Sequence, residues 1–140
     1  MTVTNGFGSY LENAILNWHR GTTFPAAPTT LYCALFTTAP INATDASAVE
    51  VSGTSYVRKS FTTLSTAFGA PSGAAPATIT SGVNIVFATP GGSWGTVVGW
   101  GIYDAASSGH LLAYGAFTGV AVGSGDTVEF LTGNLTLSSS

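Results

Sequence analysis

Charged side chains are scarce in this sequence, at 6% of its 140 residues against about 25% in an ordinary soluble domain. Its only lysines and arginines are Arg20, Arg58 and Lys59, and its formal net charge is -3. A nucleic-acid backbone is held by several cations on one face, so we expect no nucleic-acid partner. So little charge protects a surface weakly against self-association, which suits a subunit of a larger assembly. The composition is equally compatible with a Thr-rich soluble domain.

The sequence has one cysteine and no long apolar run. Cys33 is the only cysteine, so no disulfide forms within the chain and the fold does not depend on an oxidising compartment. It lies in the apolar run 31–36, where we interpret it as an inert core residue. No apolar stretch approaches the ~20 residues of a membrane span, and residues 1–5 lack the basic start of a signal peptide. We therefore expect no membrane partner and a protein that is made and used in cytoplasm.

No group of residues predicts chemistry. The six acids are spread along the chain, without a close pair of the kind that glycosidases use. His19, Cys33 and His110 each stand alone, whereas a metal site needs several ligands at matched spacing. His110 follows Ser107 and Ser108, which supplies two residue types of a catalytic triad, but a Ser-rich turn is the commoner explanation. We expect no enzyme activity, no catalytic residue, no cofactor and no metal.

One helix is predicted near the start of the chain, over residues 9–20. Ser9 is a suitable N-cap, and Glu12 three residues later completes a capping box. Gly21 is placed to end the helix, and two prolines soon after it prevent the helix from resuming. His19 falls in the last turn, where we interpret it as a helix-end residue and not as a ligand. Apolar side chains recur at helical spacing and form one stripe, Leu11, Ala14, Ile15 and Trp18.

Beyond the helix the apolar spacing changes from about 3.6 to 2, which predicts strands. Gly-rich turns separate these short strands, a pattern typical of antiparallel sandwiches. Residues 40–53 and 64–81 are predicted to be loops, and 119–125 a turn. The expected fold class is mainly β, an antiparallel β-sandwich of about seven strands preceded by one N-terminal α-helix. The predicted strands are 29–37, 56–63, 83–87, 97–104, 110–117, 127–131 and 135–137.

The chain is long enough for one domain with one core. We expect an N-terminal arm, 1–8, followed by a single domain, 9–140, with its helix at 9–20 and its sandwich at 29–137. The arm and the long loop 64–81 are the segments expected to reach neighbouring subunits. The residues predicted to form an assembly interface are Thr2, Val3, Asn5, Phe7, Phe68, Pro71, Pro76 and Trp94.

Three aromatic residues that are close in sequence, Trp94, Trp100 and Tyr103, allow two interpretations. Exposed tryptophans often form platforms for carbohydrate. Trp100 and Tyr103 are three residues apart on a predicted strand, so they point to opposite faces and at least one belongs in a core. Core and subunit-interface packing is the interpretation favoured here.

Several segments, taken in order, resemble a family of short tailed-phage proteins that are often labelled tail fibre proteins. They run from Ser9 to about Leu137 and so cover nearly the whole chain. The resemblance implies a structural protein without a catalytic motif. Proteins similar to this family also serve as capsid cement or decoration subunits on phage heads. The segments are SYLEN (9–13), LYCALFTTAP (31–40), EVSGTSYVR (50–58), WGTV (94–97), GIYDAA (101–106) and GDTV (125–128).

This resemblance implies a virion protein that is assembled in the cytoplasm of a host bacterium. The interpretation favoured from the sequence is a capsid cement or decoration protein that binds the outer head lattice and stabilises it. Its partners would be the major capsid protein and copies of itself in a homotrimer. The alternative is a tail fibre or tail-tip protein with host-glycan contact through Trp94 or Trp100. A soluble carbohydrate-binding module is a remote third.

Overall fold

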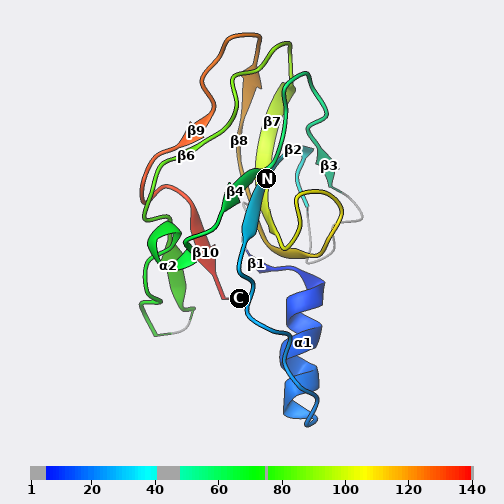
Figure 1. Cartoon of the computed structure of the whole chain (residues 1–140), viewed down its shortest axis with the longest axis vertical. Coiled ribbons are helices and arrows are strands. Elements are labelled where there is room, and N and C mark those ends of the chain that lie inside the picture. The colour runs from blue at the N-terminus through cyan, green and yellow to red at the C-terminus, as the bar shows by residue number, and fades with distance from the viewer. Residues whose placement is uncertain (1–5, 41–47, 75, 140) are drawn as a thin grey trace.

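A computed structural model describes residues 6–40, 48–74 and 76–139 of the chain. Its elements are β1 (Gly6–Phe7), α1 (Ser9–His19), β2 (Leu31–Thr38), β3 (Val49–Glu50), β4 (Lys59–Phe61), α2 (Leu64–Ala67), β5 (Thr78–Thr80), β6 (Ile85–Val86), β7 (Gly95–Tyr103), β8 (Leu111–Val122), β9 (Glu129–Phe130) and β10 (Thr136–Ser138). Six strands form the main antiparallel sheet, in the order β1-β8-β7-β2-β3 with β4 also paired to β2 (Figure 1). Two short ribbons, β5 with β10 and β6 with β9, complete the mainly β fold. Each of the seven predicted strands overlaps a strand of the structure.

The centre of the main sheet is β2, which is buried on both faces, as its continuous apolar run predicts. Cys33, Ala34, Leu35 and Phe36 are each at most 1% exposed. Successive side chains of a strand point to opposite faces, so β2 contributes to two separate clusters. Cys33 and Leu35 belong to the larger core, and Ala34 and Phe36 belong to a smaller cluster on the other face.

The larger core lies between one face of the main sheet and the two ribbons, which cover that face together with α2. Ile85 of β6 and Leu135, just before β10, are fully buried in it. Burying an aliphatic or aromatic side chain completely stabilises a fold by about 1.5–3 kcal/mol. This two-layer arrangement, in which one large sheet faces two ribbons, is the form that the predicted sandwich takes.

The opposite face of the sheet carries the smaller cluster, in which Phe36 packs edge-on against Tyr103. Gly101 of β7 passes between large side chains here. A Cβ atom on Gly101 would lie 2.7 Å from the ring of Phe36 and 2.8 Å from Leu111, so a side chain at this position would force these two side chains to shift. Phe36 and Leu111 therefore pack closely against the backbone of β7. The residues of the smaller cluster are buried on this face of the sheet.

Residues 6–8, predicted to belong to a free arm, are part of the main sheet. β1 pairs antiparallel with β8 at Tyr114 and Ala113, and the N–H of Gly8 continues the pairing by donating to the carbonyl of Leu112 at 2.7 Å. No side chain fits at Gly8, because its Cβ would collide with a backbone carbonyl of β8. The predicted arm is therefore wrong for its last three residues, and its first five lie outside the described residues.

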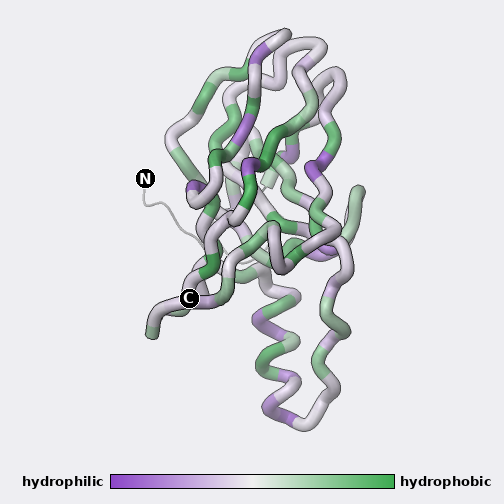
Figure 2. Tube along the Cα trace, turned by 60° about the vertical axis from the view of Figure 1, so that its left-hand side comes forward, coloured by the Kyte–Doolittle hydropathy of each residue, from purple (hydrophilic) through white to green (hydrophobic). Residues whose placement is uncertain are grey.

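Helix α1 projects from the body, and the chain after it returns along its side, so that the two form a finger (Figures 1 and 2). The helix begins directly after β1, because the sheet pairing of Gly8 places this residue at the N-cap. The Gly8 carbonyl accepts from the N–H groups of Leu11 and Glu12. Ser9 is then the first helical residue and no side chain caps the helix, so the predicted capping box is wrong. The helix ends as predicted before Gly21, which has a φ of +84°.

The segments predicted as loops and turns contain short elements as well. Segment 64–81 begins with α2 and contains β5 near its end, and segment 40–53 contains β3. The predicted turn at 119–125 is wrong in its first part, because β8 continues to Val122 past an irregularity in its pairing with β7. The predicted strand 56–63 shortens to β4, since the residues before β4 use side chains rather than backbone to contact the sheet.

Candidate functional site

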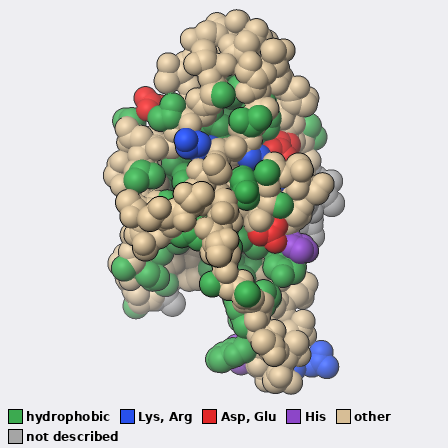
Figure 3. All heavy atoms as spheres, in the orientation of Figure 1, with side chains coloured by type: hydrophobic (Ala, Val, Ile, Leu, Met, Phe, Trp, Pro, Cys, Tyr) green, Lys and Arg blue, Asp and Glu red, His purple; other side chains and the backbone are tan. Residues whose placement is uncertain are grey.

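The finger, defined as α1 together with residues 20–30, carries three large apolar side chains on its surface. Leu16 is 64% exposed, Trp18 60% and Phe24 41%. Of the apolar stripe predicted for the helix, only Ala14 is buried, because the helix extends past the sheet and touches β8 near its base. Figure 3 shows hydrophobic side chains at the free end of the finger. Apolar side chains gathered on a projection are typical of a contact surface.

The base of the finger is tied to the β7–β8 hairpin by an aromatic stack. The rings of Tyr10 and His110 lie 3.8 Å apart at an angle of 14°. Asp104 holds His110 in place, since Oδ1 accepts its backbone N–H at 2.7 Å and Oδ2 lies 2.8 Å from the ring Nδ1. An ionised carboxylate only accepts, so Nδ1 carries the proton in this contact. The stack and these hydrogen bonds therefore join the helix to the hairpin.

The pKa of the Asp104 carboxyl lies below its ordinary value. Burial acts to raise this pKa, but hydrogen bonds from the backbone and the ring of His110 outweigh burial and favour the ionised carboxylate. His110 thus belongs to a structural contact at the end of a hairpin, and the predicted connection between the two strands is confirmed.

A partly buried ion pair joins Arg58 to Glu50. The side chain of Arg58 is 7% exposed, and its Nε and Nη2 donate to the two carboxylate oxygens of Glu50 at 2.8 and 2.7 Å. Nη1 donates to the carbonyls of Ala105 and Ser108, and the guanidinium lies 3.8 Å from the ring centre of Tyr103. Arginine suits this place because its planar group makes paired hydrogen bonds and stacks on an aromatic face at once. The contacts connect β3, the end of β7 and the hairpin after it.

Tyr56 fills a gap in the pairing of β2. On this side β2 pairs with β4 as far as Cys33 and with β3 from Phe36 onward. The Tyr56 hydroxyl accepts the N–H of Leu35 at 2.9 Å and donates to Oε1 of Glu50 at 2.9 Å. Burial, above all, raises the pKa of Tyr56. The hydroxyl therefore replaces the backbone carbonyl that a continuous neighbouring strand would supply.

This polar cluster of Glu50, Tyr56 and Arg58 is the feature that sequence reasoning missed. Tyr56 and Arg58 are two residues apart in the predicted strand 56–63, and both reach the same carboxylate. Glu50 was treated as an isolated acid in a loop. One signal in the sequence could have indicated this cluster. Charged residues are scarce in the chain, and an arginine in a predicted strand rarely lies buried unless it is paired with an acid.

The structure disperses the residues that were predicted to form an assembly interface. Phe68 and Trp94 are 7% and 3% exposed, so the prediction is wrong for these two side chains, which belong to the larger core. Phe7 is half-buried and packs against the same core from β1. Pro71 and Pro76 are exposed. Outside the described residues lie Thr2, Val3 and Asn5.

Neither tryptophan considered for glycan contact is exposed. Trp94 is 3% exposed, donates from Nε1 to the carbonyl of Thr54 at 3.0 Å, and packs edge-on against Tyr56. Trp100 is 5% exposed and lies in the larger core, whereas Tyr103 lies in the smaller cluster. The prediction that these two point to opposite faces is confirmed, and a glycan platform at either tryptophan is wrong.

The other residues considered as candidate sites, Cys33 and His19, have roles in the fold. Cys33 is fully buried, and burial raises the pKa of its thiol, which makes it unreactive. His19 is exposed in the last helical turn, with Nδ1 2.8 Å from the carbonyl of Ile15. Within 6–40, 48–74 and 76–139, no three potential metal ligands come together. Over the same ranges, no helix has the length and apolar character to cross a membrane.

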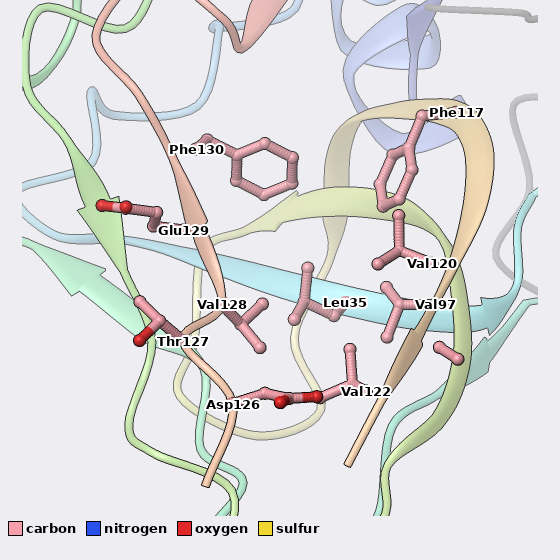
Figure 4. Close-up of a pocket in the computed structure, with 11 residues that line it drawn as sticks. Leu35, Val97, Phe117, Val120, Val122, Asp126, Thr127, Val128, Glu129 and Phe130 are labelled. Carbon is pink, nitrogen blue, oxygen red and sulfur yellow. The ribbon is translucent and has the colours of Figure 1, made fainter.

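A mainly apolar pocket of about 460 Å³ lies between β8 and the segment that leads into β9 (Figure 4). Leu35 and Val97 line it from the central strands, and Val128 points into it whereas Glu129 points away. Asp126 lies at one end, where one of its carboxylate oxygens accepts a backbone N–H of the adjacent turn at 2.7 Å. An apolar cavity of this size accommodates apolar side chains.

Comparison with known proteins identifies one family. The family model described as Podophage GP4 fiber I protein gp80 matches residues 6–138. The match therefore spans both the finger and the β body, including β1 and β10 at either end of the described fold. A search of the curated proteins finds no match.

Replacing Arg58 by methionine is expected to lower the free energy of unfolding by about 3 kcal/mol, because Glu50 then stays partly buried without its cation. The matched control is Lys59→Met, which removes the neighbouring cation from β4 without breaking an ion pair among the described residues. Urea denaturation followed by tryptophan fluorescence measures both variants. Equal stability of Arg58→Met and Lys59→Met would show that the pair contributes nothing.

The contribution of Asp104 to stability is expected to depend on pH. A carboxyl whose pKa is lowered in the folded state stabilises the fold above its unfolded value, ordinarily 3.8, and this contribution is lost as pH falls through the folded pKa. The difference in unfolding free energy between the wild type and Asp104→Asn should therefore shrink from pH 5 to pH 3. Denaturation at several pH values across this range measures it. A difference that stays constant down to pH 3 would contradict the assignment.

Proposed function

We propose that this chain, which belongs to the family of the podophage GP4 fiber I protein gp80, is a structural subunit of a phage fibre. Family membership makes it a structural protein of a phage particle. The place in the fibre is our proposal, and the observation that carries it is the match over residues 6–138, which includes nearly every residue of the described fold.

The division of the chain into a body and a finger supports a role in assembly. The body has a closely packed core, whereas the finger exposes Leu16 and Trp18. Large apolar side chains and a surface poor in charge are suited to contacts between subunits. We propose that the finger contacts a neighbouring subunit, and that copies of the chain associate as a homotrimer. Symmetric association of identical chains is the usual arrangement of such subunits.

A second candidate function is head cement, which the sequence had favoured. The specific observation for it is that the described residues form one compact body with a short finger and contain no coiled-coil stalk or repeated shaft. A module of this shape suits a clamp that binds the assembled head lattice in many copies, with the major capsid protein as partner. The third interpretation, a carbohydrate-binding module, lost its main support when both tryptophans proved to be buried.

The location of the protein in purified virions separates the first two functions. A fibre subunit should be present in few copies per particle, and a cement protein in an amount close to that of the major capsid protein. Quantitative mass spectrometry against the capsid protein gives the ratio, and cryo-electron microscopy gives the position. Density of this fold on the head lattice at near-stoichiometric amounts would overturn the fibre proposal.

Serine substitutions on the finger should reduce incorporation into virions. Each of Leu16 and Trp18 offers apolar area whose full burial in an interface is worth about 1.5–3 kcal/mol, so Leu16→Ser with Trp18→Ser should lower incorporation at least about tenfold. The unfolding midpoint should hardly change, because both side chains are exposed. Val57→Ser is the matched control, since Val57 is 64% exposed outside the finger. Immunoblots of virions that package plasmid-supplied protein measure incorporation, and equal incorporation of all variants would exclude the finger.

A further inference from the structure

The finger and the apolar pocket lie far apart within one molecule. The C-terminal end of α1 is at the free end of the finger, whereas β9 and the end of β8, which border the pocket, lie in the half of the body away from it (Figure 1). A finger therefore does not reach the pocket of its own chain. A contact between these two surfaces has to join different copies of the chain.

The free end of the finger presents a large aromatic side chain close to a cation. Trp18 is 60% exposed, and its ring packs edge-on against that of His19, with the ring centres 5.2 Å apart. Arg20, the C-cap residue of α1, is exposed as well and forms no ion pair among the described residues. The other two cations belong to the body, where Arg58 is paired and Lys59 is half-buried in β4. Exposed tryptophan and arginine are the residue types that contribute most to binding at interfaces.

The pocket offers suitable surroundings for an aromatic side chain. Its volume of about 460 Å³ falls within the range of roughly 300–1,000 Å³ that is typical of ligand sites, so an indole ring fits inside it. Apolar side chains from β2, β7, β8 and the segment before β9 converge on it (Figure 4). Val120 lines the pocket from β8 and is 56% exposed, so the pocket is open to solvent on this side.

The charges of the two surfaces also match. Asp126 is exposed at one end of the pocket and forms no ion pair among the described residues (Figure 4). One of its carboxylate oxygens accepts the N–H of Gly123, which leaves the other oxygen available to a cation. An exposed ion pair contributes little to affinity, so a pair between Arg20 and Asp126 would orient the finger while apolar area supplies most of the binding energy.

We propose that the finger of one copy enters the pocket of the next copy, with Trp18 among the apolar side chains and Arg20 beside Asp126. This inference rests on the proposed function, because it names the surface that the finger contacts on a neighbouring subunit. Finger and pocket are different surfaces, so the contact is heterologous, and copies joined in this way form a closed ring when the rotation between them permits it. A ring of three is the homotrimer proposed above.

Two variants of the purified chain, each of which loses one of the two surfaces, test the contact. Leu16→Ser with Trp18→Ser removes apolar side chains of the finger, and Val120→Asp puts a carboxylate into the wall of the pocket. All three positions are exposed, so the unfolding midpoints should hardly change. Each variant alone should associate at least about tenfold more weakly than the wild type, because its apolar area is no longer buried between copies. Analytical ultracentrifugation measures the association.

Mixing the two variants distinguishes a contact between finger and pocket from a symmetric contact. The pocket variant keeps its finger and the finger variant keeps its pocket, so the mixture should form a one-to-one dimer that neither variant forms alone. Trp94 and Trp100 are buried, so quenching of tryptophan fluorescence by acrylamide reports mainly on Trp18. Only the pocket variant carries Trp18 in this mixture, and its quenching should fall when the finger variant is added.

Thr118→Asp is the matched control for the pocket variant. Thr118 is an exposed residue of β8 that does not line the pocket, so this variant should associate as the wild type does. Val120→Thr keeps the β-branched shape of the side chain and should weaken association in the same direction as Val120→Asp. It replaces Val120→Asp if the added charge prevents folding.

Several results would overturn the proposal. They are a wild type that stays monomeric, a mixture of the two variants that forms no dimer, and a Thr118→Asp variant that associates as weakly as Val120→Asp. Association that is lost in the finger variant but kept in the pocket variant would place the finger on another surface and would overturn it as well. The fibre proposal is decided separately, by the number of copies in virions, so each of the two proposals can fail without the other.

Discussion

The rest of the structure depends on the hydrogen bonds that the Glu50 carboxylate accepts from Tyr56 and Arg58. The constraint begins in β2, a strand buried on both faces, whose backbone groups must all be paired inside the protein. Its neighbour on one side changes from β4 to β3, and the N–H of Leu35 falls in the gap. The Tyr56 hydroxyl closes this gap, and Glu50 orients the hydroxyl by accepting a hydrogen bond from it. Because the acid is partly buried, it needs the cation of Arg58 beside it.

The same network extends to the finger. Arg58 binds two carbonyls of the β7–β8 hairpin, and Asp104 and His110 close the base of that hairpin. His110 stacks on Tyr10 of α1. A series of contacts therefore runs from β3 through the hairpin to the helix. These contacts and the pairing of Gly8 with β8 together hold the finger in one orientation. For the contact with a neighbouring subunit that we propose, a surface held in one orientation loses less entropy on binding.

The sequence predicted correctly those features that depend only on residues close to one another in the chain. The apolar run of β2, the end of the helix at Gly21 and the opposite faces of Trp100 and Tyr103 follow from neighbouring residues alone. The errors concern contacts between distant parts of the chain. Gly8 was assigned to the predicted arm, 1–8, because nothing nearby in the sequence shows that it pairs with β8. Trp94 was predicted to lie at an interface. Its neighbours in the sequence do not show its core position, because that position depends on the distant segment that carries Thr54.

The scarcity of charge also determines how this protein can associate. The ion pairs among the described residues, Arg58 with Glu50 and Asp104 with His110, serve the contacts within the chain just described, and Glu50 and Arg58 neutralise each other. What the surface offers instead is the apolar finger. Contacts made by apolar area gain little from electrostatic steering and lose little in salt. The contact that we propose for the finger should therefore depend little on the ionic strength of the medium.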